Sequence, residues 1–161
     1  MALKGVPAFY LPALLASEND IKSFSMTGQR RDLNREKFKL DNLVSVLNNP
    51  ESNANKNIKY LGNAMDIRSK LEQFHPSSEM ECLSKGRSDI VVIKRGKGPE
   101  SVFAIHNMTE NKINYQLNDN DLPKIIDNDF NTQDFLTSTK YNWKNISLDP
   151  FQVIWLGSLM K

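Results

Sequence analysis

An apolar run near the start of the chain, residues 6–15, is interrupted by Pro7 and Pro12 and leads into a long polar segment. A short apolar run bounded by glycine and proline is more typical of a buried strand than of a helix. Pro7 suits the start of such a strand and Pro12 its exit into a loop, because proline cannot donate to a sheet ladder. A buried parallel strand that opens into a long polar loop is typical of a barrel, where such loops carry the active site. We therefore expect a barrel strand at residues 6–15 and a functional loop after it.

The apolar periodicity after Arg35 is helical. Apolar residues recur with the spacing of one helix face, and Pro50 ends this first helix. A second helical pattern runs from about residue 57 to residue 73. It is expected to end before Pro76, because the residue before a proline avoids the helical region. The apolar stripes consist of Leu40, Leu43, Val44 and Leu47 in the first helix, and of Tyr60, Ala64, Ile67 and Leu71 in the second.

From Ser77 onward the apolar period changes to two, which is typical of strands. Short strands about ten residues apart, with turn residues between them, indicate an antiparallel sheet or sandwich. One turn, residues 94–98, faintly resembles a phosphate loop, but it lacks the GxxxxGK[ST] pattern and is predicted to be a hairpin turn. The change near Pro76 separates two predicted domains, residues 1–76 and 77–161. The expected strands are residues 80–83, 90–94, 102–106, 113–117, 133–136 and 151–156.

A length of 161 residues allows one ordinary domain or two small ones, and is far short of the roughly 250 residues of a complete (β/α)₈ barrel. A hydrophobic content of 39% with 25% charged residues is typical of a soluble globular protein. The net charge of +2 is too small to indicate nucleic acid or an anionic membrane as a partner. The single cysteine, Cys82, excludes an internal disulfide, fits a reducing, cytoplasmic location and is expected to be half-buried in a strand. The run at residues 6–15 is too short to span a bilayer, and its two prolines argue against a signal peptide.

Six short motifs follow one another in a fixed order along the chain. They are GVPAFY (residues 5–10), ND (19–20), TG (27–28), RDLNR (31–35), FHP (74–76) and LDPFQVIWL (148–156). The first resembles the last-strand motif of the α-amylase superfamily barrel. The next three, in their order and spacing, resemble the loop that follows this strand in the sucrose phosphorylases and related α-glucoside phosphorylases. The last two agree with this branch, so the resemblance extends over nearly the whole chain and corresponds to the C-terminal part of such an enzyme.

The resemblance implies an α+β fragment. Its first part would supply the last strand and helices of a (β/α)₈ barrel, and its second part a C-terminal antiparallel β-sheet or sandwich domain. The implied parent activity is transfer of a glucosyl unit from an α-glucoside to phosphate, with retention, through a covalent enzyme intermediate and without a cofactor. Sucrose is one donor in this branch. Glucosylglycerol or glucosylglycerate would leave the same marks in this part of the chain.

Arg31 is the residue that the resemblance places in the substrate site, at the floor of the glucosyl pocket. Arginine suits this role because its planar guanidinium donates paired hydrogen bonds and stays charged. The neighbouring Arg30 makes the register ambiguous by one residue, and the spacing to Asn34 favours Arg31. Asn19 and Asp20 are expected on the loop over the site. Two interpretations stay open for them: a role near the acceptor or phosphate, or a simple turn.

Asn34 and Arg35 are expected to be structural and to tie the loop to the barrel rim through backbone carbonyls. Asp32 would pair with Arg35 or Arg30.

The catalytic residues that the resemblance implies do not match positions in this chain. Retaining glycoside chemistry needs two carboxylates about 5–5.5 Å apart. In the superfamily the nucleophilic Asp, the acid/base Glu and a third Asp come from earlier barrel strands, and none of Glu18, Asp20 and Asp32 is at a matching position. No metal site is expected, because His75 and His106 are isolated and no Cys/His cluster exists. The chain alone is therefore expected to be inactive. Two alternatives stay open: a non-catalytic carbohydrate-binding or assembly piece, and a truncated reading frame without activity.

Overall fold

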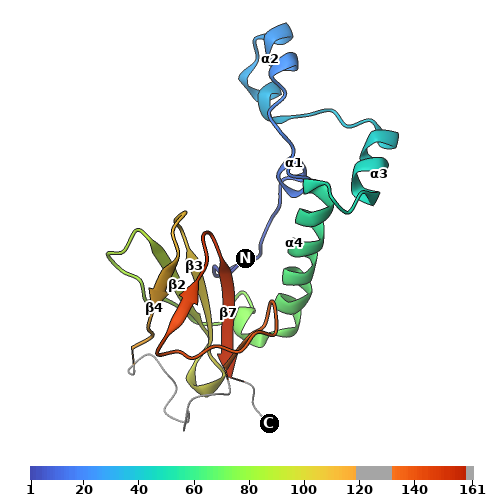
Figure 1. Ribbon diagram of the computed structural model, residues 1–161. Coiled ribbons are helices and arrows are strands. Elements are labelled where there is room, and N and C mark those ends of the chain that lie inside the picture. The colour runs from blue at the N-terminus through green and yellow to red at the C-terminus, as the bar shows by residue number, and fades with distance from the viewer. Residues whose placement is uncertain (119–131, 159–161) are drawn as a thin grey trace. The chain divides into compact units, whose positions relative to one another are not determined.

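The computed structural model describes residues 1–118 and 132–158 (Figure 1). The chain forms two compact units. One contains residues 7–65, and the other contains residues 1–6 together with the chain from residue 66 onward. We call them the helical unit and the β unit.

The β unit contains a five-stranded antiparallel sheet with the strand order β1-β2-β3-β7-β5 (Figure 1). A second sheet pairs β4 with β6, also antiparallel. The central strands are in simple register, with Val92 opposite Ile105 and Ile105 opposite Ile154. The strands are β1 (Met80–Cys82), β2 (Ile90–Arg95), β3 (Val102–Asn107), β4 (Ile113–Tyr115), β5 (Thr132–Asp134), β6 (Ile146–Leu148) and β7 (Val153–Ser158).

The core of the β unit lies where the inner faces of both sheets meet. Alternate residues of β2, β3 and β7 point into it, as the period-two pattern predicts, and both apolar residues of β6 join them. The rings of Phe103 and Trp143 meet edge to face, with centroids 6.4 Å apart. The antiparallel β-sheet domain expected from the sequence is confirmed. The core consists of Ile90, Val92, Phe103, Ile105, Leu117, Trp143, Ile146, Leu148, Ile154 and Leu156.

The helical unit contains short elements and most of one long helix. Both helices predicted from apolar periodicity form. Ser52 caps the longer one, since its Oγ accepts the N–H of Asn55 at 3.1 Å, so that helix begins four residues earlier than predicted. The elements are α1 (Leu11–Leu14), α2 (Ile21–Thr27), η1 (Arg30–Asn34), α3 (Leu40–Asn48) and α4 (Asn53–Lys70), whose last turn belongs to the β unit. The β unit adds two 3₁₀ turns, η2 (Glu72–Phe74) and η3 (Gly98–Glu100).

The strand predicted at residues 6–15 does not form. Residues 6–10 have no regular structure, Val6 is 81% exposed, and Pro12 lies in the first turn of α1. A strand is stabilised by hydrogen bonds to its neighbours, and no strand in the described part of the chain pairs with this segment. Proline is instead favourable in the first turn of a helix. The barrel portion of the predicted fold therefore stays a prediction.

Two further expectations are corrected by the sheet. Cys82 is exposed rather than half-buried, because β1 is an edge strand and all three of its residues face solvent. Strand β6 was not among the predicted strands. The turn at residues 94–98 does connect the antiparallel strands β2 and β3, as predicted, and Gly96 adopts a φ of 78° there.

Candidate functional site

The loop that carries the predicted site residues is organised around Asp20. Its carboxylate caps α2 by accepting the N–H of Ser23 at 2.8 Å and the Ser23 hydroxyl at 2.6 Å. These hydrogen bonds from Ser23 lower the pKa of Asp20 below its ordinary value. The N–H of Asp20 donates to the carbonyl of Leu33 at 2.6 Å, so the two ends of the loop lie together. Asn19 is exposed in the turn before α2.

The Thr-Gly motif also has a structural explanation. Gly28 ends α2 in the left-handed conformation, with a φ of 66° that most side chains avoid. The hydroxyl of Thr27 donates to the carboxylate of Asp32 at 2.6 Å. The expected ion pair of Asp32 with Arg30 or Arg35 is not present among the described residues. A hydroxyl already held over η1 by the end of α2 satisfies this carboxylate instead.

Arg31 lies in η1 and is exposed. The hydroxyl of Tyr10 donates to the backbone carbonyl of Asn34 at 3.1 Å, which fixes the end of η1. No carboxylate in residues 1–118 or 132–158 forms an ion pair with Arg31. The structure thus brings Asn19 and Asp20 to the chain around Asn34 and leaves the guanidinium of Arg31 exposed. Its role toward a sugar stays a prediction.

The helical unit also has a pocket of about 510 Å³ beside this loop. Its wall combines apolar side chains, such as Leu15 and Leu43, with charged ones, such as Glu18 and Lys37. The hydroxyl of Ser17 lies buried here and has no hydrogen-bond partner among the described residues. Sequence reasoning missed this pocket, because its wall combines segments 15–18, 36–46 and 53–54, which share no pattern. Arg31 is not part of the wall.

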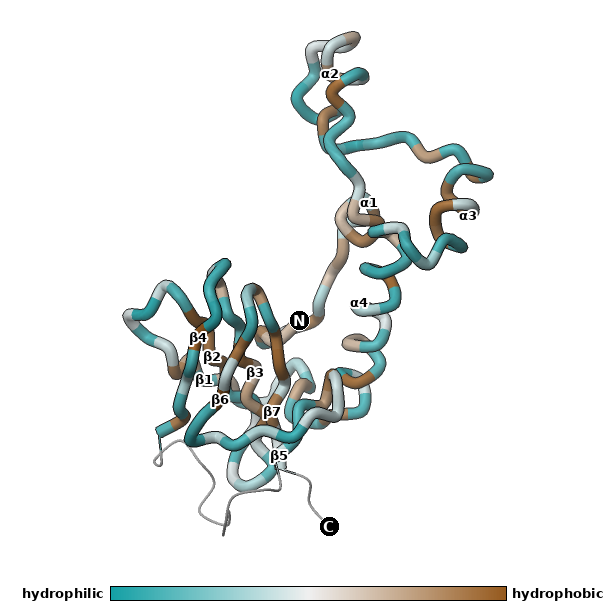
Figure 2. Tube along the Cα trace, viewed as in Figure 1, coloured by the Kyte–Doolittle hydropathy of each residue, from teal (hydrophilic) through white to brown (hydrophobic). Residues whose placement is uncertain are grey.

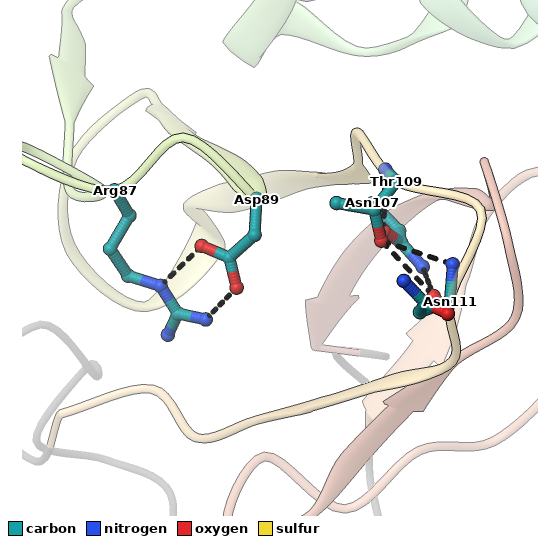
Figure 3. Close-up of polar contacts among 5 residues, drawn as sticks. All are labelled: Arg87, Asp89, Asn107, Thr109 and Asn111. Carbon is teal, nitrogen blue, oxygen red and sulfur yellow. Dashed lines mark hydrogen bonds and ion pairs between the residues drawn. The ribbon is translucent and has the colours of Figure 1, made fainter.

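A polar cluster in the β unit proves to be structural. Arg87 and Asp89 form a two-pronged ion pair in the turn before β2 (Figure 3). The side chain of Asn107 is 2% exposed, and it accepts the N–H and hydroxyl of Thr109, both at 2.9 Å (Figure 3). Its amide donates to the carbonyl of Asn111 at 2.7 Å (Figure 3). The amide also donates to the carbonyl of Asp149 at 2.8 Å, so every hydrogen-bonding atom of this buried side chain holds either the turn after β3 or the segment before β7, which leaves none for a ligand.

The two histidines lie in different environments. His75 is exposed and contacts the Ser77 hydroxyl at 2.7 Å through Nδ1, while His106 lies in β3 with a buried Nε2 that has no partner among the described residues. Burial, followed by the charge of the N-terminal ammonium, lowers the pKa of His106. Within the described residues no three His, Cys, Asp or Glu side chains are grouped as metal ligands. None of the helices in that part of the chain has the length and apolarity to cross a membrane.

Sequence comparison finds curated relatives of one kind. The chain is 31% identical to a glucosylglycerate phosphorylase from Allomeiothermus silvanus over 110 residues, which cover 68% of this chain and 20% of the relative. It is 20% identical to a glucosylglycerate phosphorylase from Escherichia coli over 156 residues, which cover 97% of this chain and 26% of the relative. The chain therefore spans about a quarter or less of the length of these relatives. A scan against protein-family models finds no match.

Solved structures share the fold. The trehalose-6-phosphate hydrolase of Bacillus licheniformis matches with a TM-score of 0.64 and 17% identity, covering 96% of this chain and 36% of that enzyme. An α-amylase of Anoxybacillus matches with a TM-score of 0.53 and 16% identity, covering 70% of this chain and 24% of the amylase. The resemblance to the C-terminal part of α-amylase superfamily enzymes, predicted from the motifs, is confirmed by these relatives and structures.

Proposed function

Because the chain resembles the C-terminal part of α-amylase superfamily proteins, with glucosylglycerate phosphorylases among its relatives, we propose that it is the C-terminal part of a retaining α-glucoside phosphorylase. The reaction would transfer a glucosyl unit from an α-glucoside to phosphate. It needs no cofactor, since the covalent intermediate forms on an enzyme carboxylate. Glucosylglycerate is the donor that the relatives' names favour over sucrose. A cytoplasmic location belongs to the same proposal.

The observation that carries the proposal is the agreement between that likeness and the position of Arg31. Its guanidinium is exposed on a loop whose ends are fixed by Asp20 and Asn34. Arginine in such a position can donate two parallel hydrogen bonds to sugar hydroxyls while pairing with a carboxylate from another segment. We propose that Arg31 holds the distal hydroxyls of the glucosyl unit. Asn19 and Asp20 would support the loop, and Asp20 does so as a helix cap.

The proposed activity needs a carboxylate pair that this chain does not supply in matching positions. A retaining mechanism requires a nucleophile and an acid/base about 5–5.5 Å apart. Asp20 already accepts two hydrogen bonds from Ser23, and Asp32 accepts one from Thr27, so both carboxylates act in the loop's own structure. We therefore propose that the 161-residue chain is inactive by itself and contributes to the glucosyl pocket when earlier barrel strands are present.

The test compares the chain alone with a chimera. In the chimera, the chain replaces the aligned part of the Allomeiothermus silvanus relative. Each protein is incubated with glucosylglycerate and phosphate, and glucose 1-phosphate is measured. We expect release by the chimera and none by the chain alone. Suppose that the chain alone releases glucose 1-phosphate, and that this release disappears when one of its own acidic residues is changed. That result would overturn the proposal that the catalytic carboxylates come from outside this chain. An inactive but folded chimera would count against the phosphorylase proposal.

A second candidate, a non-catalytic assembly piece, is favoured by the surface of the helical unit. Only three hydrophobic side chains of residues 7–65 are buried, namely Leu15, Ala54 and Ala64. Larger ones are exposed, including Met26 at 79% and Leu40 at 73%, and Figure 2 shows hydrophobic segments along α1, α2 and α3. Exposed apolar area of this kind indicates a missing partner surface.

A separately expressed barrel from the same relative, lacking the aligned part, distinguishes the two candidates. A stable complex with turnover supports the phosphorylase proposal, and a stable complex without turnover supports the assembly piece. No complex at all, together with an inactive chimera, would favour a truncated reading frame.

A further inference from the structure

Arg95, the last residue of β2, has no exposed surface and donates to three backbone carbonyls. Its Nε lies 3.1 Å from the carbonyl oxygen of Gln73, and its Nη2 lies 2.9 Å from that of His75. Its Nη1 lies 3.2 Å from the carbonyl oxygen of Ala2. One side chain therefore joins the sheet, the turn around η2 and the first residues of the chain. These three segments are distant in sequence.

Arg68, in the last turn of α4, holds the same N-terminal segment from another side. Its Nη2 donates to the carbonyl of Gly5 at 2.8 Å, and its Nη1 donates to the carbonyl of Met1. The guanidinium carbons of Arg68 and Arg95 lie 5.3 and 5.7 Å from the centroid of the Phe74 ring. Phe74 in turn packs on Trp155 of β7, with centroids 4.6 Å apart. Both guanidinium groups are thus connected to the sheet through the packed rings of Phe74 and Trp155.

Electrostatics makes this arrangement costly. Burial lowers the pKa of both arginines, and the charge of Arg68 lowers that of Arg95 further. In the described part of the chain no carboxylate forms an ion pair with either. Among the described residues, their charge is balanced by carbonyl dipoles and by the face of the Phe74 ring. Two buried like charges are a poor choice for filling space, since apolar residues of similar volume pack without a desolvation cost.

The N-terminal segment has little else to hold it. Of its side chains Ala2 is buried, whereas Leu3 is 64% exposed and Lys4 is exposed. No strand in the described residues pairs with residues 1–5. The carbonyls of Met1, Ala2 and Gly5 are those that the two guanidinium groups bind. Polar contacts, and hardly any apolar burial, therefore fix this segment.

We propose that Arg68 and Arg95 are positioning residues that fix the chain at Gly5, immediately before the segment that leads to the Asn19, Asp20 and Arg31 loop. Three hydrogen bonds from these two side chains set the path of residues 1–5, so the chain leaves the β unit after residue 6 from a fixed point. The β unit would thus serve glucosyl transfer by holding the start of the segment that carries the sugar-binding arginine. This functional part rests on the proposed phosphorylase function, and the anchoring itself does not.

Hydrogen exchange on the complete 161-residue chain tests the anchoring. Arg68→Gln removes two charge-assisted hydrogen bonds that hold this segment, in which the N–H of Lys4 donates to the Sδ of Met80 at 3.3 Å. The Lys4 amide, followed in the peptide covering residues 1–10, should therefore exchange roughly 10- to 100-fold faster. Peptides from β3 and β7 should be unchanged. The control Lys70→Gln lies in the same helix and removes an exposed ion pair with Asp66, and it should leave both regions unchanged. Unchanged exchange at residues 1–10 in Arg68→Gln would overturn the anchoring.

Arg95→Gln provides a second readout if its sheet stays folded, because it releases Ala2 while Arg68 still holds Gly5. Its effect at residues 1–10 should add to that of Arg68→Gln. Loss of protection across the whole sheet would instead assign Arg95 to global stability and restrict the proposal to Arg68.

The active chimera tests the positioning role. Arg68→Gln should lower kcat for glucosylglycerate phosphorolysis at least about tenfold, with a smaller change in KM, because a misplaced catalytic loop mainly loses transition-state contacts. Lys70→Gln should not. Faster exchange at residues 1–10 with unchanged kcat would overturn the positioning role and keep the anchoring. An inactive wild-type chimera would count against the proposed function, and the exchange result would still stand.

Discussion

The guanidinium of Arg95 lies 5.7 Å from the ring centroid of Phe74 and binds the backbone carbonyls of the residues on both sides of that ring. Arg95 therefore holds the turn around Phe74 in two ways, by contact with the Phe74 ring and by hydrogen bonds to the backbone on either side of it. Because Phe74 also packs on Trp155, this turn is attached to the centre of the sheet. The FHP motif at residues 74–76 has a physical role in this contact.

Arg95→Ala should destabilise the β unit by roughly 3 kcal/mol or more. The substitution leaves the carbonyls of Ala2 and Gln73 without these donors and removes one of the two donors to the carbonyl of His75, which keeps the N–H of Ser78. Each buried unpaired group costs about 1–3 kcal/mol. Urea denaturation followed by tryptophan fluorescence measures the change. Lys97→Ala is the matched control, because Lys97 is exposed and its ion pair with Glu79 should contribute at most about 1 kcal/mol. Equal effects of the two substitutions would contradict the assigned role of Arg95.

Asp134→Asn should cost about 1–3 kcal/mol, although it keeps the size of the side chain. Asp134 is fully buried, and its carboxylate accepts the N–H of Trp155 at 2.7 Å, the N–H of Leu136 at 3.1 Å and the Thr137 hydroxyl at 2.6 Å. An amide group replaces one of these acceptor oxygens with a donor. Asp149→Asn is the control, since Asp149 is exposed and paired with Lys112 at 3.2 Å. Chemical denaturation that ranks the two variants in the opposite order would refute this assignment.

The β unit was largely predictable, because β2, β3 and β7 are long enough to show alternating burial. The conformation of residues 6–10 could not be predicted, because an apolar segment forms a strand only if neighbouring strands are present to pair with it. Asp20 and Gly28 carried a readable signal for α2, an N-cap followed eight residues later by a C-terminal glycine, which the expectation of a loop after residue 15 obscured.

The buried arginines had no sequence signal. Arg68 and Arg95 occur in elements where charged residues are normally exposed, and their acceptors come from segments far away in the chain. The exposure of Arg31 fits its predicted role, but exposure alone does not distinguish a sugar-binding arginine from a surface one.

The stability of the β unit should fall as the pH decreases from about 8 to below 6. Burial lowers the pKa of His106, so near pH 6 the unfolded chain, with an ordinary histidine pKa of about 6.5, binds a proton that the folded chain does not. Stability therefore rises with pH through this window. His106→Gln should flatten the dependence, and His75→Gln, at an exposed position, should not. Urea midpoints measured at pH 8, 6.5 and 5.5 test this, and a steeper slope in His106→Gln would argue against it.

The cap of α2 should be lost in acid. The hydrogen bonds from Ser23 lower the pKa of Asp20, so the cap is fully present above the ordinary aspartate pKa of about 3.9 and is lost as the pH falls through the lower, folded value. The amide proton of Ser23, followed by NMR, should report this transition. Asp20→Asn should keep the cap and abolish the titration, because asparagine is an equally good capping residue. A Ser23 shift that still titrates in Asp20→Asn would assign the transition to another group.

Arg31→Ala should be nearly silent in the isolated chain and severe in an active chimera. In the chain alone Arg31 is exposed, so the substitution should change the free energy of unfolding by no more than about 0.5 kcal/mol. In the chimera it removes the proposed donor to the sugar and leaves a charged partner unpaired, which costs about 2–5 kcal/mol. At 1.36 kcal/mol per decade, kcat/KM should fall by roughly one to four orders of magnitude. Arg30→Ala, the neighbouring control, should be mild. A severe Arg30→Ala with a silent Arg31→Ala would shift the motif register by one residue, and two silent variants would refute the assignment of this loop to the glucosyl pocket.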